Sequence, residues 1–480
     1  MTALRSAVLL LAVLASTFVI AAPRFAVPEA HRTPASPESV QPAPEMLSPE
    51  AMADDLEHLI DVIEEVHPDP YAYTSRRTIR RLHRATLDRL SEPASPRTFY
   101  REAARLAAAF QDGHTLVQWP RDQFLASMRN GATVLPLSVE RNATALRIQK
   151  ACKSARSLDG RRVSSIQGQP AEHLHEDMQA LVSGPPRYRA AQVDDQFPYL
   201  AWALGLEAPY RVATTHSDGQ ATVDTLEGLR MLGVRSCLSD NRKPAFSFGR
   251  VSDADGHVVG VMTINSLRSA RRVRKGIENA LRSIQNRPVD GIVIDLRDNR
   301  GGSTATVLHV LAPFTDRTVR LTAQKSWKIS DTYKQYLKRR GLGPPAYQRA
   351  RSGKVIDIEY EPQSLPSARF RYDGPVAMLV GPRTFSAAVK LADITQYYDI
   401  APLVGSETGG RPSGFGEGYG FRLPNSGLRA MASTAEYVRL NGEREGKGVI
   451  PDVQVMDLQV GETDLAMQAA IQVVAGRDAG

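Results

Sequence analysis

Ser386 stands where a serine hydroxyl could act as a nucleophile. An apolar run of strand length, Pro375-Val-Ala-Met-Leu-Val380, precedes it, and a helical pattern with Leu391 and Ile394 follows it. Substrates of α/β proteins bind at the carboxyl edge of the sheet, where strands lead into helices. The backbone N–H of Ala387 could there stabilise an oxyanion. The alternative is that Ser386 is only the N-cap of the helix.

A second strand-to-helix junction carries a pair of glycines. The apolar run Gly291-Ile-Val-Ile-Asp-Leu296 leads into Arg297-Asp-Asn-Arg-Gly-Gly302, and a helical pattern follows. Backbone N–H groups in such a turn favour negative charge, so Gly302 is a candidate oxyanion donor. The alternative is a tight turn that needs glycine for positive φ. Because neither the dinucleotide motif nor the P-loop motif occurs here, we expect no nucleotide.

Two distant residues could complete a serine-based site. Histidine is the usual base for a serine because its ordinary pKa lies near neutrality, and His114 follows an Asp-Gly pair. Glu445 lies in a late, turn-rich segment and could orient a histidine, or it belongs to an ordinary polar loop. His173 and His175 lack the spacing of a metal-binding helix, so we interpret them as solvent-facing and expect no metal.

The N-terminus predicts export. Arg5 precedes an apolar run of 14 residues that ends near small residues, which is typical of a signal peptide over 1–22. The run is shorter than the roughly 20 residues of a membrane span, so we expect membrane attachment only through an uncleaved signal. The proline-rich stretch 23–45 predicts a linker. We expect a periplasmic or extracellular protein, in which Cys152 and Cys237 could pair.

The rest of the chain predicts three domains. Amphipathic periodicity predicts an N-terminal helical domain at 46–125, which would carry His114. Short strand-like runs and one helical segment predict an α+β module at 126–245. Continuous apolar runs of buried-strand length predict an α/β core at 246–480.

Composition excludes several classes of protein. The 480 residues are 42% hydrophobic and 23% charged, which rules out wholesale disorder and a polytopic membrane protein. The net charge of +8 is concentrated: 268–275 holds five basic residues, and 325–340 holds six against one acidic residue. We hypothesise that 325–340 flanks a substrate entrance and attracts a carboxylate, the alternative being a solvated helix face. Export argues against nucleic-acid binding.

Three motifs, in order, resemble those of the tail-specific, or C-terminal-processing, serine peptidase family. Residues 295–302 resemble its D-x-R-x-N-x-G-G loop, 384–388 its T-x-S-A-[SA] nucleophile segment, and 404–410 its V-G-x-x-T-x-G segment. The resemblance covers most of 46–475. It implies a ClpP/crotonase-like α/β core and a degenerate PDZ-like module in the middle of the chain.

The family has two catalytic branches. In the better-known branch a lysine follows the serine by about 25 residues, but this sequence has Arg411 there, and arginine does not deprotonate in proteins. Lys390 and Lys447 stand at other positions. The second branch, which resembles the core of the tricorn protease, uses serine, histidine and glutamate. Its motifs match Asp112-Gly-His-Thr115 and Glu445-Gly-Lys-Gly-Val-Ile-Pro-Asp452, although Gly113 stands where some relatives have a serine.

The resemblance implies an exported serine peptidase that cleaves peptides or protein tails through an acyl-enzyme. Ser386 would be the nucleophile, His114 the base and Glu445 the residue that orients it, with Gly302 and Ala387 as oxyanion donors. Peptides or unfolded proteins are the expected partners, and no organic cofactor or metal is implied. The alternative is a non-catalytic peptide- or lipid-binding protein on the same fold.

Overall fold

A computed structural model of the chain describes residues 46–476, except 142–144, 217, 231–232, 234–236, 239–242, 254, 445, 456–458 and 461–462. The expected signal peptide, the linker and Glu445 therefore lie outside the described residues. Within the described ranges, no helix is both long enough and apolar enough to cross a bilayer.

Three helices begin the described chain: α1 (Pro49–Val66), α2 (Arg76–Arg89) and α3 (Pro96–Ala108). Each follows a serine whose side chain accepts a backbone N–H of the first turn, which explains where each helix begins. The short strand β1 (Leu116–Val117) and helix α4 (Arg121–Arg129) come next. These helices confirm the helical periodicity in the sequence.

The middle module is built on an antiparallel sheet with the strand order β2-β3-β4-β6-β7. Its strands are β2 (Leu137–Arg141), β3 (Leu146–Ala151), β4 (Arg162–Ile166), β5 (Gln169–Pro170, paired with β4), β6 (Tyr210–Thr215) and β7 (Ala221–Leu226). The 3₁₀ helix η1 (Lys153–Leu158) and helices α5 (Ala171–Gln179) and α6 (Pro186–Ala203) accompany it. One apolar core runs from α1–α3 into this module, so both predicted domains share it. The boundary between residues 125 and 126 stays a prediction.

The C-terminal block holds a six-stranded sheet with the order β17-β14-β13-β10-β9-β8. The strands are β8 (Phe246–Ser252), β9 (Val258–Ile264), β10 (Gly291–Asp295), β13 (Val376–Val380), β14 (Leu403–Gly405) and β17 (Val453–Gln454). All pair in parallel except β8, which is antiparallel to β9. The helices that cover it are α8 (Ala270–Asn286), α9 (Thr304–Leu311), α12 (Ala387–Tyr397) and α13 (Leu465–Val474).

Helices on both faces explain why these strands read as unbroken apolar runs. Ile292 and Ile294 of β10 pack in the cluster that contains α8, α9 and α12, whereas Val293 packs in the cluster that contains α13. The α/β core predicted from the sequence is thereby confirmed.

A second sheet of the C-terminal block receives a strand from the N-terminal region. Its order is β1-β16-β11-β12, with β15 paired to β16. Its further strands and the helices beside it are β11 (Gln324–Lys328), β12 (Val355–Glu359), β15 (Gly414–Arg422), β16 (Arg429–Val438), α10 (Asp331–Arg339) and α11 (Pro345–Arg349). Leu116 pairs with Met431, which fixes the loop before β1 against the core. The small hairpin of β18 (Gln459–Val460) and β19 (Thr463–Asp464) precedes α13.

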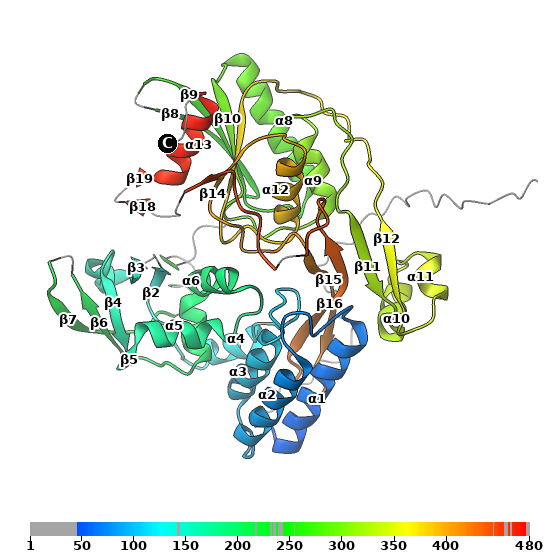
Figure 1. Cartoon of the computed structure of the whole chain (residues 1–480). Coiled ribbons are helices and arrows are strands. Elements are labelled where there is room, and N and C mark those ends of the chain that lie inside the picture. Colours follow the sequence, from blue (N-terminus) through cyan, green and yellow to red (C-terminus); the bar gives the residue numbers. More distant parts are fainter. Residues whose placement is uncertain are drawn as a thin grey trace, which may run out of the picture.

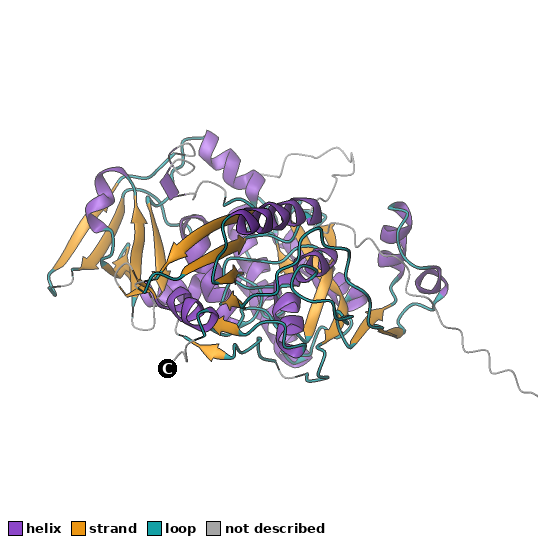
Figure 2. Cartoon of the chain, turned by 90° about the horizontal axis from the view of Figure 1, so that it is seen from above, coloured by secondary structure: helices purple, strands orange, loops and turns teal. Residues whose placement is uncertain are grey.

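Figures 1 and 2 show the sheet of the middle module at one end of the molecule and the α10–α11 pair at the other. The α/β core lies between them, above the N-terminal helices in the view of Figure 1. The loops that follow β10 and β13 both contact Asp195 of the middle module, and the second also contacts His114 of the N-terminal region.

Candidate active site

Ser386 adopts an unusual backbone conformation at the start of α12. Its φ is 56° and its ψ is −123°, a region that non-glycine residues seldom occupy. It occupies the N-cap position of α12, but its side chain makes no capping hydrogen bond. Instead its Oγ lies 3.2 Å from Nε2 of His114, 272 residues away in the sequence. The strained turn therefore holds the hydroxyl against an imidazole.

The loop after β10 is pressed against this turn. The side chain of Asn299 accepts the N–H of Gly301 at 2.8 Å, and its backbone carbonyl accepts the N–H of Phe385 at 3.0 Å. Gly301 has a φ of 91°, and a Cβ there would lie 2.8 Å from Cβ of Ser386. Glycine is therefore favoured at position 301 for two reasons: the positive φ and the close approach to the turn at Ser386.

Two backbone N–H groups beside Ser386 remain available for an oxyanion. The amides of Gly302 and Ala387 donate no hydrogen bond to any residue that the structure describes, and both residues line the cavity at Ser386. A Cβ on Gly302 would lie 2.4 Å from the backbone of Leu267, so only glycine fits there. Unpaired N–H groups beside a nucleophile can stabilise the negative charge of a tetrahedral intermediate.

Asp112 is the acidic residue that the structure places beside His114. It is 4% exposed and accepts hydrogen bonds from four neighbours: the hydroxyls of Thr115 and Ser433, each at 2.6 Å, Nε2 of His67 at 3.3 Å and the backbone N–H of His114 at 3.1 Å. Burial alone would raise the pKa of Asp112, but the hydrogen bond and charge of His67, the charge of His114 and the hydrogen bond from Ser433 hold it well below its usual range.

The carboxylate of Asp112 therefore stays ionised, with one oxygen 4.0 Å from Nδ1 of His114. The sequence pattern assigned no catalytic or positioning role to Asp112. The only signal was its place two residues before the histidine.

His114 itself is kept neutral. Burial lowers its pKa, and the charge of Lys390 lowers it further, whereas the charge of Asp112 and a backbone hydrogen bond with Phe415 oppose the shift. Its ring stacks on Phe385 at 4.9 Å, and Phe385 stacks on Tyr188 of α6 at 4.1 Å. The stack fixes the imidazole plane, and a neutral imidazole can accept a proton from Ser386.

Gly113 leaves room for this stack. A Cβ on Gly113 would lie 2.5 Å from the Phe385 ring, which is held between Tyr188 and His114. The serine that some relatives carry at this position would not fit without movement of the ring.

Arg411 does not replace the lysine of the better-known branch. Its Nε donates to the carbonyl of Gly446 at 2.9 Å, its Nη1 donates to the carbonyl of Gln111 at 3.0 Å, and its guanidinium lies 3.9 Å from the centroid of the Tyr73 ring. It thus clamps the histidine loop to the segment that follows Glu445. The structure provides no position for Glu445 itself.

The cavity at Ser386 has a volume of about 710 Å³. Four of the five predicted site residues line it: Ser386, His114, Gly302 and Ala387. Arg268 and Arg272, from the first basic stretch, line it as well, whereas no residue of 325–340 does. Tyr333 and Leu337 of α10 are instead buried in an apolar cluster, although Lys325 at the start of the stretch contacts the lining residue Glu417 at 2.5 Å.

One of the two histidines interpreted as solvent-facing is buried. Nε2 of His175 lies 3.2 Å from a carboxylate oxygen of Asp194, and its Nδ1 contacts the side chain of Gln179 at 2.9 Å. That interpretation was wrong for His175 because α6 covers this face of α5. His173 is exposed, as expected.

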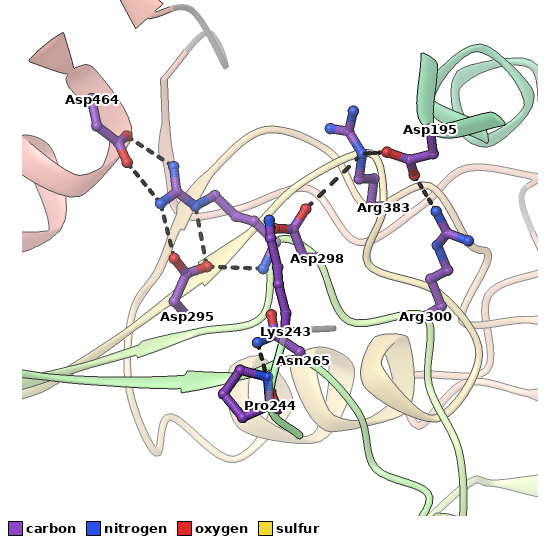
Figure 3. Close-up of polar contacts among 10 residues, drawn as sticks. Asp195, Lys243, Pro244, Asn265, Asp295, Asp298, Arg300, Arg383 and Asp464 are labelled. Carbon is purple, nitrogen blue, oxygen red and sulfur yellow. Dashed lines mark hydrogen bonds and ion pairs between the residues drawn. The ribbon is translucent and has the colours of Figure 1, made fainter. Parts of the chain in front are cut away.

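Helix α6 is also tied to both loops of the site. Figure 3 shows the carboxylate of Asp195 between Arg383, three residues before Ser386, and Arg300, two residues before Gly302. Nε of Arg383 donates to it at 3.0 Å. Asp298 lies 4.0 Å from the same arginine and pairs with Lys243 at 2.7 Å. Asp195 of the middle module therefore contacts both the loop that carries Gly302 and the turn that carries Ser386.

Comparison with known proteins relates the α/β core to a family of peptidases. The sequence profile of Peptidase family S41 matches residues 258–455, which include Gly302, Ser386 and Ala387. This match over the α/β core supports the peptidase family that the three sequence motifs predicted, and the chain is a serine-type peptidase. No curated protein matches the chain.

Solved structures share the fold at low sequence identity. Mature CPAF in complex with lactacystin superposes with a TM-score of 0.60 at 14% identity, over 84% of this chain and 94% of that one. A second structure of mature CPAF gives a TM-score of 0.60 at 14% identity, over 89% and 95%. The photosystem II D1 C-terminal processing protease gives 0.44 at 16% identity, over 89% and 98%. At these identities the likeness concerns the fold alone.

Proposed function

We propose that this chain is an exported peptidase in which Ser386 and His114 form the catalytic pair. The observation that carries the proposal is the contact between Oγ of Ser386 and Nε2 of His114, made on a strained turn beside two backbone N–H groups that no described residue accepts. A serine whose hydroxyl caps the helix would have relaxed backbone angles and a side-chain hydrogen bond into its own helix. Ser386 has neither.

In the proposed reaction Oγ of Ser386 attacks the carbonyl carbon of the scissile bond while His114 accepts its proton. The negative charge that develops on the carbonyl oxygen is stabilised by the N–H groups of Gly302 and Ala387, each worth about 2.7–4 kcal/mol in comparable sites. The imidazolium then protonates the leaving amine. Water, activated by the same histidine, hydrolyses the acyl-enzyme and restores the serine.

Two carboxylates are candidates for stabilising the imidazolium. Glu445 is the residue that the family motif implies, and the Arg411 clamp brings Gly446, its neighbour, to the histidine loop. Asp112 is ionised and close to Nδ1 of His114, but 4.0 Å is too long for a hydrogen bond. We propose that Glu445 orients the ring, while Asp112 positions the loop and adds a negative charge.

The nucleophile is tested by labelling purified protein with a fluorophosphonate probe. The wild type should react and Ser386→Ala should not, whereas Ser406→Ala, which alters a serine outside the cavity lining, should label normally. Labelling that survives Ser386→Ala would overturn the assignment. Saturable binding of a peptide or lipid by a wild type that the probe does not label would favour the alternative of a binding protein.

The orienting carboxylate is tested by comparing Glu445→Gln with Asp112→Asn. Loss of the residue that orients the imidazole lowers kcat by roughly 10⁴-fold in a well-studied serine protease. We expect Glu445→Gln to have the larger effect on kcat. Asp112→Asn should also lower the thermal stability because it leaves hydroxyl donors with a weaker acceptor. The opposite order would assign the orienting role to Asp112.

Export is supported by the disulfide between Cys152 and Cys237, because such bonds persist in oxidising compartments. Expression with and without residues 1–22 tests it. The full chain should appear in the periplasm or medium with the disulfide formed, and the truncated chain should stay in the cytoplasm. Retention of both forms in the cytoplasm would contradict export.

A further inference from the structure

Lys390 is a charged residue of the catalytic cavity that the proposed reaction does not use. It lies on α12 four residues after Ser386, which on an α-helix is about one turn, or 6 Å along the axis. Its side chain lines the cavity, and Nζ lies 3.4 Å from the centroid of the Tyr437 ring. A cation on an aromatic face keeps its N–H groups available to a further ligand.

No carboxylate of the described chain neutralises this ammonium group. Nζ of Lys390 lies over the Tyr437 ring and makes no hydrogen bond or ion pair with any described residue, and Glu417 and Asp393 act on it only through their charge. Glu417 is nearby but accepts hydrogen bonds from Lys325 at 2.5 Å, Trp327 at 3.0 Å and Tyr437 at 2.7 Å. Asp393 is likewise paired, with Arg439 at 2.8 Å.

The surroundings of Lys390 disfavour its protonated form. Burial and the charge of Lys325 lower the pKa of Lys390 to about 7, although Glu417 and Asp393 oppose that shift. A bound anion would reverse part of this effect because an opposite charge favours the protonated form.

The rim of the cavity has the same sign of charge. Arg268 and Arg272 line it, are exposed, and have side chains that form no ion pair with the described residues. The two acidic residues in the lining, Asp112 and Glu417, are both saturated by donors. The charges that remain available to a substrate are therefore positive.

We infer that Lys390 is a specificity determinant that binds a carboxylate of the peptide substrate next to the scissile bond. The inference rests on the proposed function, because it concerns the substrate of the same site. The carboxylate can come from an acidic side chain or from the C-terminus of the substrate. Both present the same planar anion to the ammonium, and Arg268 and Arg272 attract it to the cavity.

Paired peptides test the inference. A peptide that the wild type cleaves is made with Glu or Gln on either side of the scissile bond, and with a free or an amidated C-terminus. We expect one carboxylate form to be cleaved with a kcat/KM about tenfold higher than its neutral partner, the scale of one charge-assisted hydrogen bond. A preference for Glu would show that Lys390 binds a side-chain carboxylate of the substrate. A preference for the free C-terminus would show that it binds the terminal carboxylate. Equal rates for all pairs would overturn the inference.

Variants connect the preference to the residue. Lys390→Met should bring the ratio close to 1, whereas Lys390→Arg, which keeps the charge, should retain a preference. Lys338→Met, which removes an exposed lysine of α10 outside the cavity lining, should behave as the wild type. An unchanged ratio in Lys390→Met would overturn the inference.

Binding without turnover provides a second measurement. In the Ser386→Ala background, the affinity for the preferred carboxylate peptide should fall about tenfold when Lys390→Met is added, and the affinity for the neutral peptide should not. If Lys390→Met abolished turnover of every peptide but left both affinities equal to those of the parent, Lys390 would act in proton transfer instead, and the inference would be wrong. Fluorophosphonate labelling of the wild type reports separately on the proposed function.

Discussion

The proposed base His114 lies between charges of opposite sign. Asp112 raises its pKa, Lys390 lowers it, and burial, the largest influence, lowers it as well. The two charged residues reach the histidine from different parts of the chain, the histidine loop and helix α12. The pH dependence of the enzyme therefore reports on both contacts.

The acid limb of kcat/KM should lie below the ordinary histidine value of about 6.5, because burial lowers the pKa of His114 and the base must be neutral to act. With a neutral peptide, Lys390→Met removes a positive charge and should move the limb to higher pH. Asp112→Asn removes a negative charge and should move it to lower pH. If both variants moved the acid limb in the same direction, the opposing effects of Lys390 and Asp112 on the pKa of His114 would be contradicted.

Gly113 provides a steric test at the same scale. Gly113→Ala places a methyl group 2.5 Å from the Phe385 ring, so ring and imidazole must separate. We expect kcat/KM to fall more than tenfold, because a misplacement of about 1 Å can cost a hundredfold in rate. Gly249→Ala is the matched control, since a Cβ there meets no atom within 4 Å. Similar activity of both variants would show that the stack does not position His114.

Among the elements, α6 has the most direct connection to the site. Tyr188 in its first turn stacks on Phe385, and Asp195 two turns later contacts Arg300 and Arg383 (Figure 3). The helix belongs to the middle module, and the two arginines belong to the core. The position of the module is thus coupled to the loops that carry Gly302 and Ser386.

Asp195→Asn should lower kcat about tenfold, because both loops lose the charge that holds them. The melting temperature should change little, since partly exposed ion pairs contribute only about 0–1 kcal/mol. Asp177→Asn is the matched control, because it breaks a pair with Arg105 that lies outside the cavity. A loss of activity that merely follows a loss of stability would contradict a positioning role for Asp195.

On the scale of the whole molecule, one covalent bond closes the middle module. The disulfide between Cys152 and Cys237 spans 85 residues of sequence. It therefore ties the end of β3 to the segment that leads toward the core.

Replacing both cysteines with serine should lower the free energy of unfolding by about 2–4 kcal/mol, since the unfolded chain gains the freedom of the opened loop. Urea denaturation with and without a reductant measures the effect. The reductant should destabilise the wild type and leave the double variant unchanged. Equal midpoints for the oxidised wild type and the double variant would show that the bond does not stabilise the fold.

The sequence alone determined the elements and the order of the motifs. Apolar periodicity predicted the helices of the N-terminal region, and unbroken apolar runs identified strands buried on both faces, because these signals depend on near neighbours. The apolar runs predicted the α/β core, and the resemblance of three motifs indicated the peptidase family.

Only the tertiary structure decided which distant groups meet. Asp112 acquires its hydroxyl donor from Ser433, 321 residues away, and Arg411 reaches Gln111 across 300 residues. The sequence led to the hypothesis that 325–340 flanks the substrate entrance. In the structure, Arg268 and Arg272 of the other basic stretch line the cavity. A local charge count does not reveal which face of a helix is buried, as the buried Tyr333 and Leu337 of α10 illustrate. Among the described residues, only the tertiary contacts show that Glu417 and Asp393 are paired with other side chains and not with Lys390.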